Sequence, residues 1–151
     1  MIEPKVQKAL NKQVNAEFSA FYSYLSMAAY FASHHMPGCA RWFKAQSNEE
    51  GKHAMKLYEH IIARGGKVAL TAIEAPGTEW KSYLSVFEAG YAQELEVSGL
   101  IDGLVDMARN EHDHATEIML QWFVTEQVEE EKTVREIVAK LLELQQPDGG
   151  W

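Results

Sequence analysis

Six residues with metal-binding or amide side chains occur at matched positions in the two halves of the chain. They are Glu17, Glu50, His53, Glu94, Gln127 and Glu130. Glu50 follows Glu17 by 33 positions (50 minus 17), and Gln127 follows Glu94 by the same 33 (127 minus 94). Glu50 is the first member of the pair Glu50–His53, and Gln127 is the first member of the corresponding pair with Glu130. The members of each pair are three positions apart, which places both on one face of a helix. The repeat predicts one polar site built from two similar halves.

Four carboxylates in an apolar interior need compensating positive charge, because each buried unpaired charge costs several kcal/mol. One histidine cannot offset four glutamates, whereas two divalent cations would supply the missing charge. The donor set is rich in oxygen, holds one nitrogen and lacks a thiolate, which favours iron or manganese, with zinc as a competitor. It is not the zinc-protease pattern, since Glu49 and not histidine stands four residues before His53.

Four helical runs must position these residues. Each run carries an apolar stripe at helical spacing that turns polar only near its middle. The expected helices cover residues 4–35, 39–64, 83–109 and 114–146. Met36, Pro37 and Gly38 predict the first turn, and Ser85 with Glu88 resembles a capping box near the start of the third helix. We expect residues 1–146 to form one helical bundle and 147–151 a short tail.

The lengths of the connections predict the topology of the bundle. Two short turns make two antiparallel hairpins. The 18-residue connection over 65–82 can span roughly 59 Å when extended, and a 26-residue helix is roughly 39 Å long. The connection can therefore cross the whole bundle, which makes the second and third helices parallel. The prediction is an all-α, up-down-down-up four-helix bundle with one long crossover and the polar residues level at mid-height.

Composition and charge exclude several classes of function. Hydrophobic residues make up 46% of the chain, and the formal net charge is -8. An acidic chain is a poor partner for nucleic acid, and no apolar run is long enough to span a membrane. Cys39 is the only cysteine, which excludes an intrachain disulfide and cysteine-rich metal sites and fits a cytoplasmic protein.

Several segments together resemble the bacterial and archaeal non-haem ferritins over about residues 3–145. They are Leu10 to Glu17, Glu49 to His53, Glu94, and Leu120 to Glu131. The resemblance implies oxidation of Fe(II) by O2 or H2O2 at a di-iron centre and storage of the ferric mineral in a protein cage. It implies that Glu17, Glu50 and His53 hold the first iron. Glu50 would bridge to a second iron held by Glu94 and Glu130.

The same resemblance implies further roles near the two iron ions. Gln127 would sit beside the second iron, and Tyr24 would donate an electron or hydrogen-bond a ligand. A third iron site in this branch of the family corresponds to Glu49, Glu126 and Glu129. From its position in the sequence, we also expect Trp122 to pack in the core close to the site.

Three departures separate the chain from other members of the resembled family. The second pair is Gln127-x-x-Glu130 and not Glu-x-x-His, which argues against a bacterioferritin. Gly51 stands where bacterioferritins carry a haem-ligating methionine, so no haem is predicted. The fifth, C-terminal helix of the family is expected to be absent, since a Pro147 to Gly150 terminator is followed only by Trp151. A homo-oligomeric cage of 24 subunits is favoured, and a dimer is the alternative.

Other interpretations of the same residues remain open at this point. One is a dimeric ferritin-like di-iron or di-manganese oxidase that stores nothing. Another is a non-catalytic helical interaction module whose mid-bundle glutamates are merely hydrated. Tight binding of two Fe(II) ions per chain without oxygen would exclude the module. A DNA-protecting mini-ferritin fits poorly, because that class builds its site between subunits and the predicted site closes within one chain.

Overall fold

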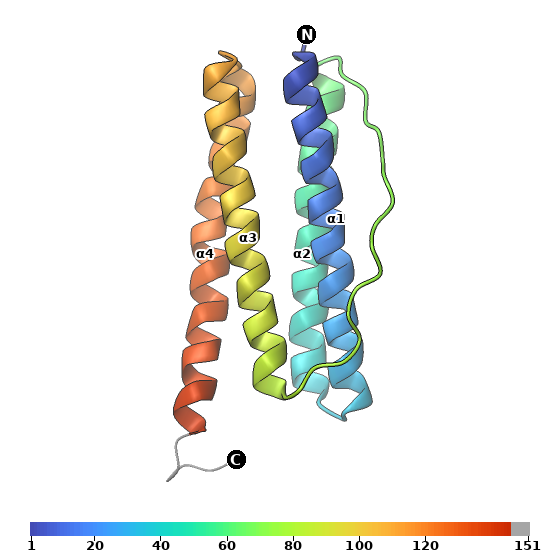
Figure 1. Cartoon of the computed structure of the whole chain (residues 1–151), viewed down its shortest axis with the longest axis vertical. Coiled ribbons are helices and arrows are strands. Elements are labelled where there is room, and N and C mark those ends of the chain that lie inside the picture. Colours follow the sequence, from blue (N-terminus) through green and yellow to red (C-terminus); the bar gives the residue numbers. More distant parts are fainter. Residues whose placement is uncertain (146–151) are drawn as a thin grey trace.

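The computed structural model describes residues 1–145, which form four long helices arranged as a bundle (Figure 1). The helices are α1 (Pro4–Ser33), α2 (Pro37–Ala63), α3 (Tyr83–Asn110) and α4 (His114–Leu144). α1 with α2 and α3 with α4 form antiparallel hairpins, and a long segment returns the chain to the other end between them. The predicted topology with one crossover is confirmed, and residues 1–145 contain no fifth helix. The predicted terminator at 147–150 lies outside the described residues.

The first turn lies earlier than the sequence indicated. Pro37 and Gly38 are the first residues of α2, and the turn is formed by residues 34–36, with His35 at a φ of 58°. Proline fits the first helical position because its missing N–H has no partner there and its φ is already helical. Gly65 follows the predicted end of α2 at a φ of 75°, as expected of a glycine after a helix.

The start of α3 also differs from the prediction. Ser82 is the N-cap, and its hydroxyl accepts a hydrogen bond from the backbone N–H of Ser85 at 3.1 Å. The predicted box of Ser85 and Glu88 is therefore wrong, because Ser85 already lies inside the helix. The extended backbone of Ser82 is what allows its side chain to reach the first turn.

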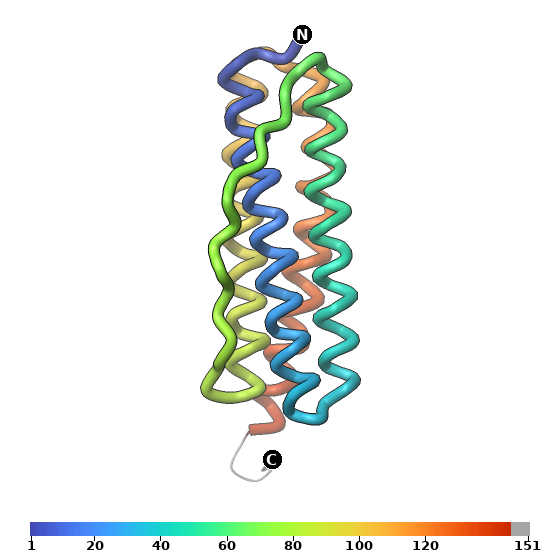
Figure 2. Tube along the Cα trace, turned by 90° about the vertical axis from the view of Figure 1, so that its right-hand side faces the viewer, coloured from blue at the N-terminus to red at the C-terminus, as the bar shows by residue number. Residues whose placement is uncertain are grey.

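The crossover between α2 and α3 is held along α1 by side chains of that helix (Figure 2). The amide of Asn11 donates to the Lys67 carbonyl at 2.9 Å and accepts from the Ala69 N–H at 2.8 Å. Farther along, Asn15 donates to the carbonyls of residues 71 and 72, and Ser26 donates to that of residue 77. These bonds satisfy backbone groups of an 18-residue segment that has no secondary structure of its own.

The core consists of two apolar clusters, one toward each end of the bundle. One is mainly aliphatic and includes Leu10, Leu57, Ile101 and Leu120. The other is aromatic and includes Phe31. The polar residues singled out above lie between the clusters in sequence along each helix. The apolar residues occupy one face of each helix, and among residues 1–145 no helix is long and apolar enough to cross a membrane.

A charged pair ties the end of α2 to the start of α4. The Arg64 guanidinium donates to Asp113 at 2.6 Å, and Asp113 caps α4 by accepting from the Thr116 N–H at 3.0 Å. Burial alone would raise the pKa of Asp113, but the hydrogen bonds from Arg64 and Thr116 outweigh it and hold that pKa below its usual value. The ionised pair therefore contributes to stability at neutral pH.

Removing this pair is expected to destabilise the metal-free protein. Arg64→Met keeps much of the side-chain length but leaves the buried Asp113 carboxylate without its guanidinium partner. A hydrogen bond to a charged group is worth about 1.5–3 kcal/mol, so the free energy of unfolding should fall by that amount. Urea unfolding at pH 7 measures the change.

Arg109→Met is the matched control for this prediction. Arg109 forms an ion pair with Glu117 at 3.1 Å, but 60% of its side chain is exposed. Exposed pairs contribute about 0–1 kcal/mol, so this variant should unfold close to the wild type. Equal losses in the two variants would contradict a special role for the Arg64–Asp113 pair.

Candidate metal centre

The six polar residues predicted at mid-bundle are all buried in the structure. Glu17, Glu50 and Glu94 are 0% exposed, His53 is 1% exposed, and Gln127 and Glu130 are 4% and 8% exposed. Two of them come from α1 and α3, and the two i, i+3 pairs come from α2 and α4. Each helix thus contributes to one polar layer between the two apolar clusters of the core.

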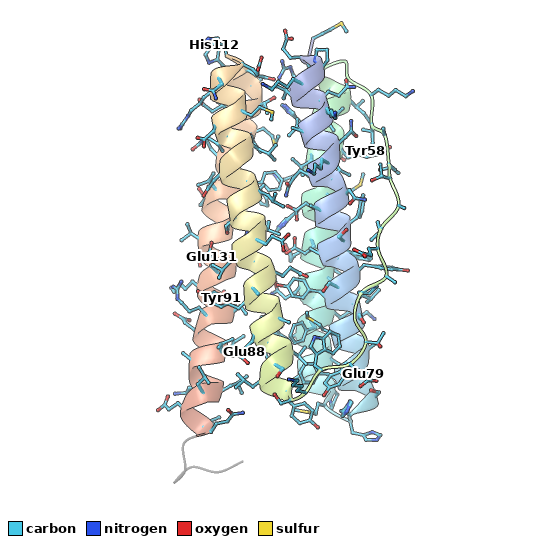
Figure 3. The ribbon with its side chains drawn as sticks, viewed as in Figure 1. Tyr58, Glu79, Glu88, Tyr91, His112 and Glu131 are labelled. Atoms are coloured by element: carbon cyan, nitrogen blue, oxygen red, sulfur yellow. The ribbon has the colours of Figure 1, made fainter. Side chains whose placement is uncertain are left out.

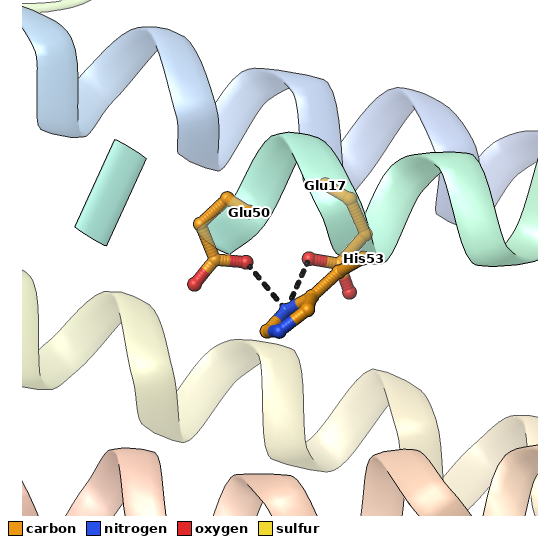
Figure 4. Close-up of side chains that lie close together, drawn as sticks. All are labelled: Glu17, Glu50 and His53. Carbon is orange, nitrogen blue, oxygen red and sulfur yellow. Dashed lines mark hydrogen bonds and ion pairs between the residues drawn. The ribbon is translucent and has the colours of Figure 1, made fainter. Parts of the chain in front are cut away.

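The first metal-binding group joins α1 to α2 (Figure 4). The His53 Nδ1 atom lies 3.2 Å from the Glu50 carboxylate and 4.0 Å from the Glu17 carboxylate. One donor atom from each of these three residues lies within 4.8 Å of the other two. Each of these three residues has one buried atom without a hydrogen-bond partner among the described residues: Glu17 Oε2, Glu50 Oε1 and His53 Nε2. Buried polar atoms without partners are rare, and a bound cation would satisfy them.

The second group shares Glu50 with the first and joins α2 to α3 and α4. Carboxylate oxygens of Glu50, Glu94 and Glu130 lie within 4.8 Å of one another. No ion pair among residues 1–145 brings a lysine or arginine to these three carboxyls. Because Glu50 belongs to both groups, the layer has the arrangement of two adjacent cation positions with one shared carboxylate.

Burial and mutual repulsion favour protons on several of these carboxyls when no metal is bound. Burial raises the pKa of Glu17, and burial together with the neighbouring Glu94 raises the pKa of Glu50 well above its usual value. Burial and then the charge of Glu94 raise the pKa of Glu130 to about 8. Cation binding must therefore displace protons, as is usual for carboxylate sites.

Tyr24 and Gln127 hold Glu94 from two sides. The Tyr24 hydroxyl donates to Glu94 Oε1 at 2.6 Å, and the Gln127 amide nitrogen donates to Glu94 Oε2 at 3.2 Å. Burial, followed by the charge of Glu94, raises the pKa of Tyr24 well above its usual value, so the phenol keeps its proton. Gln127 was predicted beside the second position and Tyr24 near the two metal ions, and both contact Glu94, a carboxylate of the second position.

A third group lies on the side of the layer formed by α2 and α4. Donor atoms of Glu49, His53 and Glu126 lie within 4.8 Å of one another, and both glutamates are half-buried. Through His53 this group adjoins the first one. The structure thus brings three overlapping carboxylate and histidine groups into one small region.

Comparison with known proteins now assigns the family. A family model described as a ferritin-like domain matches residues 7–144 of this chain. The chain belongs to the ferritin family. The bacterial non-heme ferritin of Bacteroides fragilis is 45% identical to this ferritin over 141 residues, covering 93% of this chain and 89% of that protein. That of Staphylococcus saprophyticus is 42% identical over 131 residues, covering 87% of this chain and 78% of that protein.

Solved structures agree with this assignment. An open pore ferritin from the archaeon Archaeoglobus fulgidus superposes on this ferritin with a TM-score of 0.95. The two are 45% identical, and the match covers 98% of this chain and 91% of that one. Chlorobium tepidum ferritin superposes with a TM-score of 0.95 at 35% identity, covering 99% of this chain and 91% of that one.

Two of the residues singled out in the sequence are exposed in this ferritin. Glu129 is exposed on α4 and is not part of the group formed by Glu49 and Glu126, whose third member is His53. Trp122 is not in the core, since 38% of it is exposed and its ring packs edge-on against His53 at a centroid distance of 5.3 Å. The spacing along the sequence predicts where these residues lie along the bundle axis. It does not predict whether each side chain faces the core or the surface.

Proposed function

We propose that this ferritin oxidises Fe(II) to Fe(III) at an intra-subunit di-iron centre and stores the ferric product in a protein cage. The observation that carries the proposal is the pair of buried groups that share Glu50 and lack a compensating lysine or arginine among the described residues. Glu17, Glu50 and His53 hold one iron, and Glu50, Glu94 and Glu130 hold the other. Iron is the substrate here, so the site must both bind and release it.

The chemistry that follows needs two electrons from two metal ions. Two Fe(II) ions together reduce O2 to H2O2, or H2O2 to water, as each loses one electron. Carboxylate oxygens stabilise the more highly charged Fe(III) product, because they are hard, anionic donors. The shared Glu50 keeps the two ions close enough to act on one oxidant molecule.

Tyr24 and Gln127 act beside the second iron in this proposal. Tyr24 donates its hydrogen bond to Glu94 and orients that ligand, and its phenol is close enough to supply a further electron. Gln127 donates to the other oxygen of the same carboxylate. Fixing both oxygens of a metal-binding carboxylate is a common way to set its geometry.

The group of Glu49, His53 and Glu126 is proposed to hold a third iron on its way to or from the centre. Glu129 follows Glu126 by three positions, so it lies on the same side of α4 and can extend this route at the surface. No haem is proposed, because Gly51 offers no side-chain ligand.

One sample tests both parts of the proposal. We expect the purified protein to elute as a cage of 24 subunits with a mass of about 400 kDa by light scattering. We expect two Fe(II) ions per chain to bind tightly without oxygen, and iron added in air to co-elute with the cage in large excess over two per chain.

Each part of the proposal can fail separately. A mass of about 35 kDa would indicate a dimer, and the storage function would be rejected while oxidation remained. Absence of tight Fe(II) binding would reject the di-iron centre and favour a helical interaction module. Tight binding of manganese in preference to iron would favour a di-manganese oxidase.

A further inference from the structure

A row of hydrogen bonds runs from the surface of α4 to the second metal-binding group. The Ser98 hydroxyl on α3 donates to the Glu131 carboxylate on α4, and both residues are half-buried. The Gln127 amide nitrogen donates to the Ser98 hydroxyl oxygen at 3.1 Å and to Glu94 Oε2 at 3.2 Å. Figure 3 shows Glu131 on α4 near mid-height of the bundle.

The direction of each bond in this row follows from its outer end. An ionised carboxylate can only accept hydrogen bonds, so Ser98 must use its single hydrogen toward Glu131. The hydroxyl oxygen is then free to accept, and only the nitrogen end of the Gln127 amide can donate to it. The Glu131–Ser98 pair therefore supports one orientation of the Gln127 amide, the same orientation in which its nitrogen donates to the backbone carbonyl of Glu94 at 3.2 Å.

This orientation of the Gln127 amide matters because the same amide also contacts Glu94. The amide nitrogen donates to the Glu94 carboxylate. In the reversed orientation the amide oxygen would lie next to that carboxylate, and the two oxygens would repel each other. With Tyr24 donating to Oε1, both oxygens of Glu94 have a donor. The amide oxygen of Gln127 remains as the end able to accept a hydrogen bond or contact a metal ion.

The half of the site formed by α1 and α2 has no pair of residues equivalent to Ser98 and Glu131. A shift of 77 positions superimposes Glu94 on Glu17 (94 minus 17), and the same shift places Ser98 on Phe21 and Glu131 on Ala54. Neither apolar side chain can form such a bond. Glu17 is supported instead by its own helix, since the Gln13 amide donates to it at 3.2 Å. The two halves are therefore supported by different interactions.

We propose that Ser98 and Glu131 are positioning residues for the second iron, acting through Gln127 on Glu94. This inference rests on the proposed di-iron function and adds that the second position alone depends on the Ser98–Glu131 pair. Neither residue belongs to any of the three metal-binding groups found among residues 1–145. Their effect on metal binding is therefore indirect.

The test is a titration of the full-length protein with cobalt(II), which binds carboxylate and histidine sites without being oxidised in the assay. Ser98→Ala removes one of the acceptors of the Gln127 amide nitrogen and should weaken the second binding step about tenfold, leaving the first unchanged. Ser98→Thr keeps a hydroxyl and should restore the second step. Ser26→Ala removes a hydroxyl that bonds to the crossover and should change neither step.

Variants of Glu131 separate hydrogen bonding from charge. Glu131→Gln removes the negative charge but keeps an oxygen that can accept from Ser98, so the second step should stay within about twofold of the wild type. Glu131→Leu removes the acceptor, so the second step should weaken. Equal weakening in both variants would show that Glu131 acts only by its charge and would overturn the proposal.

Two further outcomes have distinct meanings. If the wild type binds two cobalt ions and Ser98→Ala binds them equally tightly, the positioning role is rejected and the di-iron function stands. If the wild type binds neither ion, the proposed function itself fails. Should Ser98→Ala not fold, as judged by circular dichroism and native mass, the comparison of Glu131→Gln with Glu131→Leu decides the question.

Discussion

Glu50→Ala is expected to slow the initial oxidation of Fe(II) by about 100-fold or more in a chain that still folds. The reason is that Glu50 belongs to both metal-binding groups, so one change removes a proposed ligand of each iron and the proposed link between them. Folding should survive, since the change also removes a buried carboxyl that repels its neighbours. Stopped-flow absorbance of ferric product in the first seconds after mixing with O2 measures the rate.

Glu130→Ala should also abolish rapid oxidation, because it removes a proposed ligand of the second iron. Glu59→Ala is the matched control on α2, since Glu59 is exposed and lies outside all three groups. Its initial rate should stay within about twofold of the wild type. Unchanged rates in both Glu50→Ala and Glu130→Ala would reject the assignment of the di-iron centre.

The second large effect concerns the stability of the metal-free protein between pH 5 and pH 8. The pKa of Glu130 is about 8 in the folded chain, against 4.5 for an ordinary glutamate. The folded state therefore binds a proton that the unfolded state has already lost. This contribution to stability is fully present below about pH 4.5 and is lost as the pH rises through about 8. We expect the contribution of Glu130 to the free energy of unfolding to fall steadily across this range.

Glu130→Gln should remove much of this pH dependence. At pH 8 the neutral amide avoids the cost of a buried charge, so the metal-free variant should be about 1–3 kcal/mol more stable than the wild type. Glu136→Gln, an exposed position on the same helix, is the control and should be nearly neutral. Urea unfolding at several pH values measures the effect. Lower stability of Glu130→Gln at pH 8 would contradict it.

The pKa of Asp113 and the effect of a bound cation both bear on this prediction. Asp113 has a lowered pKa, so its contribution to stability is lost only as the pH falls below about 3.8, outside the tested range. A divalent cation should reverse the order of the variants, because it binds the folded wild type more tightly than Glu130→Gln and stabilises it by mass action. The same unfolding series with cobalt(II) present checks this reversal.

The fold was predictable because helical periodicity and connection length constrain it strongly. The apolar stripes identified four helices, and an 18-residue crossover allowed only one simple arrangement of two hairpins. The errors lay at the ends of elements. Pro37 marked the start of α2 and not a turn, and Ser82 capped α3 in place of Ser85. Helix ends depend on single hydrogen bonds, which periodicity does not report.

The sequence by itself determined the height of the polar layer. A helix rises 1.5 Å per residue, so equal offsets from two short turns bring Glu17 level with Glu50, and Glu94 level with Gln127. Burial of all four followed, because the positions lie on apolar stripes. These are one-dimensional properties of each hairpin and can be counted along the chain.

The tertiary structure alone decided which side chains meet around that layer. It joined His53 to Glu49 and Glu126, left Glu129 exposed, and linked Ser98 to Glu131 beside Gln127. Each of these depends on how far each helix is rotated about its axis and which rotamer packing permits. Rotation and rotamer are set by contacts between helices distant in the sequence, and spacing along one helix carries no information about them.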